Sequence, residues 1–290
     1  MSPTSLTTFL STVSATVGES PVWDDRLHRL WWVDVRAPAL HRTDPATGAT
    51  ETWPLPEAVG SLALCESGAV VLALRSGLHR FAVATGALTL LARCPGEPAS
   101  NRLNDGKTSP DGRFFVGSMP EGGSREPSGA LHRLDPDGSC HRLVEGLTVS
   151  NGLAWSPDGR TLWHADSHTS RIWTRPYDPA TGAIGVGREV AAPDEATGRP
   201  DGAAMDVEGG YWSAGVSAGV LNRWLPDGRL DRQVRLPVSA PTMPCFGGEG
   251  LRTLFVTSLR RNAQAGPNEG RLVVLDVGVA GVPVARFAGA

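Results

Sequence analysis

The sequence predicts an all-β protein that folds as a six-bladed β-propeller with four-stranded antiparallel blades. A pattern of a short apolar strand, a turn of the Asp/Gly type and a second apolar strand recurs six times along the 290 residues. Five of the turns end in a glycine, at Gly68, Gly112, Gly159, Gly209 and Gly250, and Asp24-Asp25 is the equivalent turn of the first copy. Successive glycines are separated by 44, 47, 50 and 41 residues. A repeat of about 40–50 residues built from strands is typical of propeller blades.

Each repeat supplies the short strands of one blade, bounded by Gly, Pro and Asp as hairpins require. Residues 5–17 contain many β-branched side chains, and we expect there a strand that pairs with the last blade and closes the ring. Second strands are expected at residues 30–34, 70–74, 114–117, 162–165, 211–214 and 254–257. A later strand is expected at 40–42, 78–81, 131–134, 172–173, 220–224 and 272–276. No helical period and no linker divides the chain, so residues 1–290 are expected to form a single domain.

Composition and charge argue against several classes of function. The formal net charge is −3 and no basic stripe is present, so nucleic acid is not an expected partner. No apolar run approaches the ~20 residues of a membrane span, and residues 1–18 do not resemble a signal peptide. The four cysteines, Cys65, Cys94, Cys140 and Cys245, show neither close pairing nor zinc-finger spacing. Free thiols in a reducing cytoplasm are therefore expected, whereas the oligomeric state is not indicated.

The repeat also places polar residues at equivalent positions. Counting eight residues back from the turn glycines reaches Gly60, Asn104, Asn151, Asp201 and Thr242. Glu19 precedes Trp23 by four residues, as Asn151 precedes Trp155, so Glu19 holds this position in the first blade. Equivalent positions of a propeller form a ring around its channel, and two carboxylates and two amides there suit a hard divalent cation. Asn and Asp also form turns before strands, but four such residues in one register favour a site.

Other motifs are better explained by structure. Three connections, at residues 119–129, 191–200 and 260–270, are longer than the repeat requires, and the first two are expected on the functional face. Gly215-Val216-Ser217-Ala218-Gly219 matches a nucleophile pattern, but it falls in a hairpin rather than a strand-to-helix elbow. The repeated Leu-His-Arg at His41, His79 and His132 indicates a structural element. Lys107, the single lysine, could form a Schiff base, although packing or pairing with a carboxylate is more typical at its position.

These stretches resemble the regucalcin/gluconolactonase (senescence marker protein) family over nearly the whole chain. The resemblance rests on residues 18–23 (Gly-Glu-Ser-Pro-Val-Trp), 101–107 (Asn-Arg-Leu-Asn-Asp-Gly-Lys), 150–155 (Ser-Asn-Gly-Leu-Ala-Trp), 199–202 (Arg-Pro-Asp-Gly), 246–248 (Phe-Gly-Gly) and 254–258 (Leu-Phe-Val-Thr-Ser). It implies a six-bladed propeller that holds one divalent metal ion through Glu19, Asn151 and Asp201. Members of the family commonly hydrolyse sugar lactones to aldonic acids, so a small sugar lactone is the implied substrate.

The resemblance also implies roles for substrate-binding residues. Asn104 matches a ring residue close to metal and substrate, Arg102 matches an arginine that contacts substrate, and Glu121 is the candidate for an acidic substrate contact. Asp201 could both ligate the metal and act as the catalytic base, with Glu19 and Asp105 as the next candidates for the base. A metal on oxygen ligands can polarise the lactone carbonyl and acidify water.

Three functions remain open on the sequence alone. The first is a metal-dependent sugar lactonase, the second a related esterase or phosphotriesterase on the same ring, and the third a non-enzymatic metal-binding propeller. The intact set of three predicted metal ligands disfavours the third. Oxygen ligands suit calcium, magnesium or manganese, and zinc also accepts carboxylates.

Overall fold

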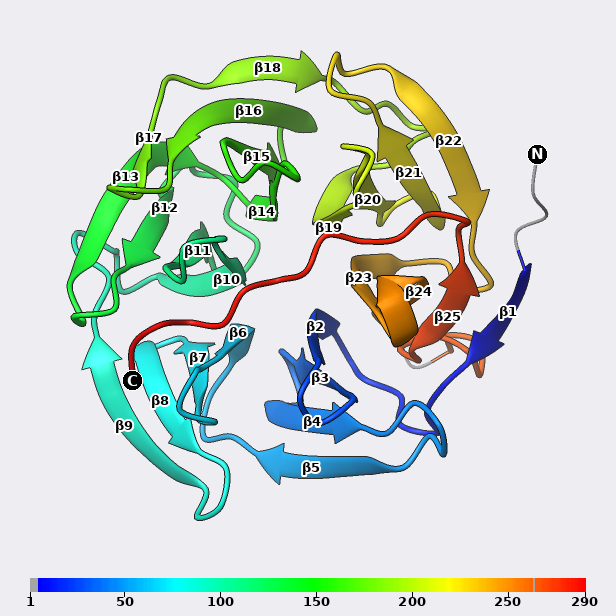
Figure 1. Cartoon of the computed structure of the whole chain (residues 1–290), viewed down its shortest axis with the longest axis horizontal. Helices are drawn as coiled ribbons and strands as arrows, with labels where there is room; N and C mark the ends of the chain where they lie inside the picture. The colour runs from blue at the N-terminus through cyan, green and yellow to red at the C-terminus, as the bar shows by residue number, and fades with distance from the viewer. Residues whose placement is uncertain (1–4, 263) are drawn as a thin grey trace.

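The computed structural model describes residues 5–262 and 264–290 and contains six antiparallel sheets around a central channel (Figure 1). The six-bladed propeller predicted from the sequence is therefore confirmed. In each blade the first strand lies innermost and the later strands follow outward. Within the described residues, no helix combines the length and apolarity that crossing a bilayer requires.

The blades follow one another along the chain, and each uses one sequence repeat. Blade one contains β2 (Gly18–Asp24), β3 (Arg29–Asp34), β4 (Ala39–Thr43) and β5 (Thr50–Pro54), and blade two contains β6 (Val59–Leu64), β7 (Val70–Leu74), β8 (Gly77–Ala82) and β9 (Ala87–Ala92). Blade three contains β10 (Asn101–Thr108), β11 (Phe114–Pro120), β12 (Gly129–Leu134) and β13 (Cys140–Leu147). Blade four contains β14 (Ser150–Trp155), β15 (Thr161–Asp166), β16 (Arg171–Asp178), β17 (Ala183–Ile184) and β18 (Arg188–Ala191). Blade five contains β19 (Pro200–Met205), β20 (Tyr211–Gly215), β21 (Val220–Trp224) and β22 (Leu230–Arg235).

The last blade joins the two ends of the chain. It contains β23 (Pro241–Gly247), a 3-10 turn (Glu249–Leu251), β24 (Thr253–Ser258), β25 (Val273–Asp276) and, outermost, β1 (Ser5–Phe9). Strand β1 pairs antiparallel with β25, with Phe9 opposite Val273. The predicted closure of the ring by the N-terminal strand is thus confirmed, and it leaves β25 paired on both edges. Blade four departs from the common pattern because two short strands, β17 and β18, share the outer edge of β16.

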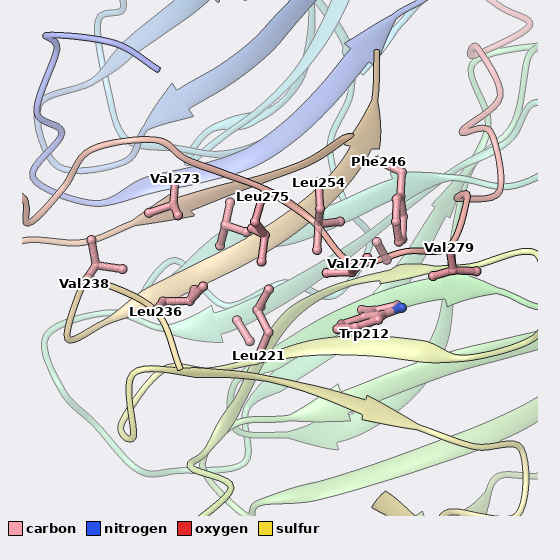
Figure 2. Close-up of a cluster of buried hydrophobic side chains, with 13 residues drawn as sticks. Trp212, Leu221, Leu236, Val238, Phe246, Leu254, Val273, Leu275, Val277 and Val279 are labelled. Atoms are coloured by element: carbon pink, nitrogen blue, oxygen red, sulfur yellow. The ribbon is translucent and has the colours of Figure 1, made fainter. Parts of the chain in front are cut away.

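The hydrophobic core lies between neighbouring blades. Strand β7, for example, is buried at every residue, whereas the outer strand β22 is exposed at nearly every one. Figure 2 shows the contact between blades five and six, where Trp212 and Leu221 face Leu254 and Leu275. The indole nitrogen of Trp212 donates a hydrogen bond of 2.8 Å to the carboxylate of Asp206. Burying a large apolar side chain stabilises the fold by roughly 1.5–3 kcal/mol, so each blade depends on the next.

The C-terminal segment, residues 277–290, crosses one end of the channel (Figure 1). Val282 N donates to Met205 O at 2.8 Å, and Phe287 N donates to Leu64 O at 2.8 Å. Both acceptors lie at the carboxyl ends of inner strands. The side chain of Phe287 is buried against the core between blades two and three. The repeat gave no indication of this segment, which covers the channel end where the inner strands finish.

Candidate active site

Every inner strand is irregular at the same level of the channel. The pairing with the second strand shifts between Glu19 and Val22, Val59 and Ser61, Leu103 and Gly106, Asn151 and Ala154, Pro200 and Ala203, and Pro241 and Pro244. A bulge of this kind adds a residue to one strand, increases its twist and changes the direction of its side chains. The ring positions predicted from the repeat lie in or beside these six irregularities. The repeat therefore encodes both the blades and the place where polar side chains turn toward the channel.

Two of these irregularities depend on a left-handed backbone directly after a polar residue. Gly152 follows Asn151 with φ 66°, and a Cβ at Gly152 would lie 2.3 Å from the hydroxyl oxygen of Tyr211. Only glycine fits both the backbone and the space. Ser20 follows Glu19 with φ 49°, a region that non-glycine residues seldom occupy. Its hydroxyl accepts a hydrogen bond of 3.0 Å from Leu62 N in the next blade, which helps to hold this conformation.

Four of the six ring positions face a cavity of about 800 Å³ at the channel end where the inner strands begin. They are Glu19 from β2, Asn104 from β10, Asn151 from β14 and Asp201 from β19. The structure thus brings together the four residues that the repeat aligned.

The other two ring positions, Gly60 and Thr242, do not line the cavity. The structure gives a separate reason for each. A Cβ at Gly60 would lie 2.4 Å from Leu103 O and 2.6 Å from Asn104 O, so blade three leaves no room for a side chain there. The hydroxyl of Thr242 is buried and donates to the carbonyl oxygen of Gly18, the residue before Glu19, at 2.5 Å. Gly60 therefore allows blade three to pack closely, and Thr242 holds the backbone next to Glu19.

A chain of hydrogen bonds fixes the amide groups of the ring. Arg102 Nη1 donates to Asn104 Oδ1 at 2.8 Å, and Asn104 Nδ2 donates to Asn151 Oδ1 at 3.1 Å. Asn151 Nδ2 in turn donates to Ser167 Oγ at 2.7 Å, and Ser167 Oγ donates to Pro200 O at 2.5 Å. Because the amide nitrogen of Asn151 donates to Ser167, the amide oxygen of Asn151 points toward Asn104 and the ring. Ser167 follows β15 and was not singled out by the sequence.

The carboxylates of the ring are crowded, and the nearby charges of Arg102 and Arg199 only partly offset their burial and mutual repulsion. Burial, with Asp201 and Asp105 nearby, raises the pKa of Glu19 well above its usual value. Burial and the charge of Asp105 raise the pKa of Asp201 to about 7. Among the described residues, the Glu19 carboxylate accepts one hydrogen bond, from Ser20 N at 3.3 Å. Desolvated carboxylates that repel one another in this way favour a bound cation or bound protons.

Asp105 and Lys107 lie deeper, along the same strand. Asp105 Oδ2 accepts a hydrogen bond of 3.0 Å from Leu153 N, whereas Oδ1 is buried without a partner in the described part of the chain. Burial raises the pKa of Asp105 although the nearby charge of Lys107 opposes the shift. Lys107 Nζ donates to Ala203 O, and this side chain lines a separate void of about 30 Å³ rather than the large cavity. Its position gives no support to the Schiff-base alternative.

The long connections contribute unevenly. Glu121 does not line the cavity; its carboxylate is 3.2 Å from Arg75 Nη1 at the surface. The 119–129 connection provides Met119 to the cavity wall, and the 191–200 connection provides Arg199. The 260–270 connection, which the sequence analysis did not favour, provides three lining residues, Arg260, Arg261 and Asn262. His168 and Arg36 also line the cavity, and neither carried a sequence signal for this role.

Comparisons with known proteins agree with this architecture. The sequence model of the SMP-30/Gluconolactonase/LRE-like region matches residues 17–260. The chain is 38% identical to 6-deoxy-6-sulfogluconolactonase of Pseudomonas putida over 280 residues, which cover 94% of this chain and 95% of that protein. It is 34% identical to regucalcin of Gallus gallus over 287 residues, with the same coverage. The crystal structure of regucalcin from Agrobacterium tumefaciens, described as a calcium-binding protein, superposes with a TM-score of 0.90 at 27% identity, covering 97% of this chain and 96% of that one.

Proposed function

Because the chain belongs to the SMP-30/gluconolactonase/LRE-like family, we propose that it is a metal-dependent hydrolase that opens sugar lactones to aldonic acids. The observation that carries the proposal is the pair of desolvated carboxylates, Glu19 and Asp201, beside the amide oxygen of Asn151 on the cavity wall. Relatives named as a lactonase and as regucalcin support it. The four free thiols suit action in the reducing cytoplasm.

The residues fit a divalent metal ion on chemical grounds. Glu19, Asn151 and Asp201 would hold it through oxygen atoms, and the raised pKa values of the two carboxyl groups reflect burial and repulsion that a bound cation would relieve. Oxygen donors suit calcium, magnesium or manganese, and zinc accepts carboxylates as well. When bound, such an ion supplies Lewis acidity toward the lactone carbonyl and toward water.

Asp201 is the proposed base. In hydrolysis its carboxylate accepts a proton from the attacking water, whose oxygen forms the new bond to the lactone carbonyl carbon. The same carboxyl then returns the proton to the ring oxygen as the ester bond breaks, so that the products are a free hydroxyl and a carboxylic acid, which releases its remaining proton to solvent at neutral pH. A pKa of about 7 without a cation makes Asp201 a stronger base than an ordinary aspartate. Positive charge in the ring lowers this pKa and favours the unprotonated form that the first step needs.

Arg102 and Asn104 are the proposed substrate-orienting residues. Arg102 Nη1 already donates to Asn104 Oδ1 and Leu103 O, which fixes the guanidinium and leaves other N–H groups for substrate hydroxyls. Asn104 Nδ2 is engaged with Asn151 Oδ1 and Ser150 O, so Asn104 ties substrate orientation to the metal ligands. For Glu121, the ion pair with Arg75 means that a substrate contact would require the side chain to leave its partner.

A substrate panel on metal-stripped and reloaded protein tests this function. Protein treated with chelator would be reloaded separately with calcium, magnesium, manganese or zinc and assayed with sugar lactones, a simple carboxylic ester and a phosphotriester. We expect sugar lactones to be the preferred substrates, with activity lost on stripping and restored by at least one ion. Acid release can be followed with a pH indicator. A preference for the phosphotriester or ester would favour the second candidate function, and turnover that survives stripping would contradict metal dependence.

A further inference from the structure

The cavity is lined by more positively charged side chains than negatively charged ones. Five arginines line it, Arg36 from the β3–β4 turn, Arg102 from β10, Arg199 before β19, and Arg260 and Arg261 after β24. The carboxylates among the lining residues are Glu19 and Asp201. The whole chain has a formal net charge of −3, so this concentration does not follow from overall composition. A cleft lined by one sign of charge concentrates ligands of the opposite sign.

Several arginines elsewhere in the protein are held by an acidic partner. Arg42 pairs with Glu51 at 2.8 Å and Arg223 pairs with Asp206 at 2.7 Å. Over residues 5–262 and 264–290, none of the five cavity arginines forms an ion pair. An arginine fork without a carboxylate partner is suited to bidentate binding of an external anion.

Three of the five keep the whole guanidinium group available. Arg102 Nη1 donates to Asn104, and Arg261 Nη2 donates to Val216 O at 2.5 Å. The guanidinium groups of Arg36, Arg199 and Arg260 make no hydrogen bond within the described residues, and all three side chains are exposed at the rim. Arg36 also lies close enough to Arg102 for its charge to add to burial in lowering the pKa of Arg102.

Of the three free arginines, Arg199 lies near enough to Asp201 for its charge to lower the pKa of that carboxyl, whereas Arg36 and Arg260 reach the cavity from blades one and six. The product carboxylate forms at the lactone carbonyl, beside Asp201, which is only 9% exposed. The exposed side chains of Arg36 and Arg260 would instead meet the end of the substrate farthest from that carbonyl. A product carboxylate alone therefore does not account for three unengaged guanidinium groups.

We propose, on the basis of the lactonase function proposed above, that the substrate is a sugar lactone with an ionised acid group at the end remote from its carbonyl. Arg36, Arg199 and Arg260 bind this group, which can be a sulfonate, a phosphate or a carboxylate, since all three offer several oxygen acceptors to arginine forks. Arg102 and Arg261 add positive potential behind it.

The test compares lactones that differ only in this group. The value of kcat/KM would be measured for D-glucono-1,5-lactone and for its analogues with a phosphate, a sulfonate or a carboxylate at carbon 6. We expect the parent to prefer at least one anionic lactone by about 10–100-fold, the range of a charged hydrogen bond. This preference should fall as salt is added, whereas turnover of the neutral lactone should respond less. The analogue with the highest kcat/KM shows whether the bound acid group is a phosphate, a sulfonate or a carboxylate.

The triple variant Arg36→Gln/Arg199→Gln/Arg260→Gln removes the proposed contacts. Its kcat/KM should fall by about 10–100-fold for the anionic lactone and by much less for the neutral one. Arg229→Gln, an exposed arginine in the turn before β22, is the matched control and should keep the parent's preference. If an active parent has the same kcat/KM for all four lactones, or if the preference for the anionic lactone persists in the triple variant, this inference is wrong. Neither outcome contradicts the lactonase function. Hydrolysis of none of them by metal-loaded parent would instead contradict the lactonase function.

A second, independent observation lies outside the channel, between blades two and three. Cys94 follows β9, Cys140 begins β13 and His132 lies on β12. The potential ligand atoms of these three residues all lie within 4.8 Å of one another. The two sulfur atoms are 3.9 Å apart. Two thiolates on one tetrahedral zinc ion, with Zn–S bonds of about 2.3 Å, are separated by about 3.8 Å.

His132 is prepared to act as the third ligand. Its side chain is fully buried and Nε2 is 2.8 Å from Glu97 Oε2. Nδ1 is buried and has no hydrogen-bond partner in the described part of the chain. A histidine that ligates a metal through one nitrogen commonly donates its other N–H to a carboxylate, which fixes the ring and its tautomer. His132 therefore combines a ring held by a carboxylate, a nitrogen without a partner among the described residues, and a position within 4.8 Å of both sulfurs, as a metal ligand requires.

We propose that Cys94, His132 and Cys140 bind a zinc ion, separate from the metal of the channel, that links blade two to blade three. Both cysteines are only half-buried, so water can fill the fourth position. The sequence did not indicate this site, because its ligands come from three separate segments and do not have zinc-finger spacing. The Leu-His-Arg repeat also made His132 resemble a purely structural histidine.

Cobalt substitution separates this site from the channel. Thiolate ligands give cobalt a near-ultraviolet charge-transfer band that oxygen ligands do not. We expect the band in the parent and in Glu19→Gln, which lacks a channel ligand, and its loss in Cys94→Ser/Cys140→Ser. Zinc content measured by elemental analysis should fall by one ion per chain in the double serine variant. Absence of the band in the cobalt-loaded parent, unchanged zinc content in the double variant, or a Cys94–Cys140 disulfide in protein purified with zinc would overturn the proposal.

Discussion

Replacement of Asp201 with Asn should reduce kcat for lactone hydrolysis by about 10²–10⁴-fold, the contribution of a general base. Asparagine keeps the shape of the side chain and one ligand oxygen, so saturating metal can restore occupancy without restoring the base. The comparison therefore has to be made at metal occupancy measured in both proteins. Acid release from the lactone, followed with a pH indicator, gives the rate.

The pH dependence of the same pair of proteins adds a second readout. A base is active when unprotonated, so activity of the parent should fall as the pH drops through the pKa of Asp201. That pKa is about 7 without a cation, and bound metal shifts the fall to lower pH. The Asp201→Asn variant should lack this acid limb. Its residual rate should then depend on the concentration of hydroxide.

Asn151→Asp is the contrasting variant, because it adds a carboxylate to the ring and leaves Asp201 in place. It should keep more activity than Asp201→Asn, although the added negative charge makes the metal a poorer Lewis acid. If metal-saturated Asp201→Asn turns over like the parent, Asp201 is a ligand only. Glu19 and Asp105 would then be the next residues to test as the base.

The sequence specified the fold and the ring for one physical reason. A propeller repeats one strand pattern, so residues at equivalent places in the repeat reach equivalent places around the channel. Glu19, Asn104, Asn151 and Asp201 could be aligned without any knowledge of contacts, and the structure places all four on one cavity. The bulge beside each position is part of the repeat as well.

Features that depend on contacts between distant segments could not be predicted in this way. The C-terminal segment pairs with Leu64 and Met205, which belong to different blades and share no sequence period with it. Arg36 and Arg260 reach the cavity from turns of different lengths, so they have no common register. Glu121 was placed by resemblance, and its ion pair with Arg75 of the neighbouring blade is a contact that a single strand pattern does not encode.

Replacement of Glu19 with Gln should change two properties in opposite directions. Metal affinity should fall by at least about 10–100-fold, the range measured when only an outer-shell partner of a metal ligand is lost. The metal-free protein, in contrast, should become more stable at pH 8. Burial and repulsion from Asp201 and Asp105 raise the pKa of Glu19, so its ionised form destabilises the metal-free fold. Glutamine has a similar shape and carries no charge.

The sign of the effect with pH follows from proton linkage. A carboxyl group whose pKa is raised in the folded protein keeps its proton after the unfolded chain has released it, so its contribution to stability is lost as the pH rises. For Asp201 this window runs from 3.8, the ordinary value, to about 7. The free energy of unfolding of the metal-free parent should therefore decline across this range, and the decline should be smaller in Glu19→Gln.

Urea denaturation in chelator measures the stability, and calorimetric titration measures the metal affinity. Asn151→Asp provides the opposite case, because a further carboxylate in the ring should lower the stability of the metal-free protein at pH 8 and should not weaken metal binding. If metal-free Glu19→Gln is no more stable than the parent at pH 8, the ring carboxylates do not repel one another as inferred. If its metal affinity is also unchanged, Glu19 is not a ligand. The crowded carboxylates that lower the stability of the metal-free protein are the same groups that attract the cation, so stability is lost where function needs it.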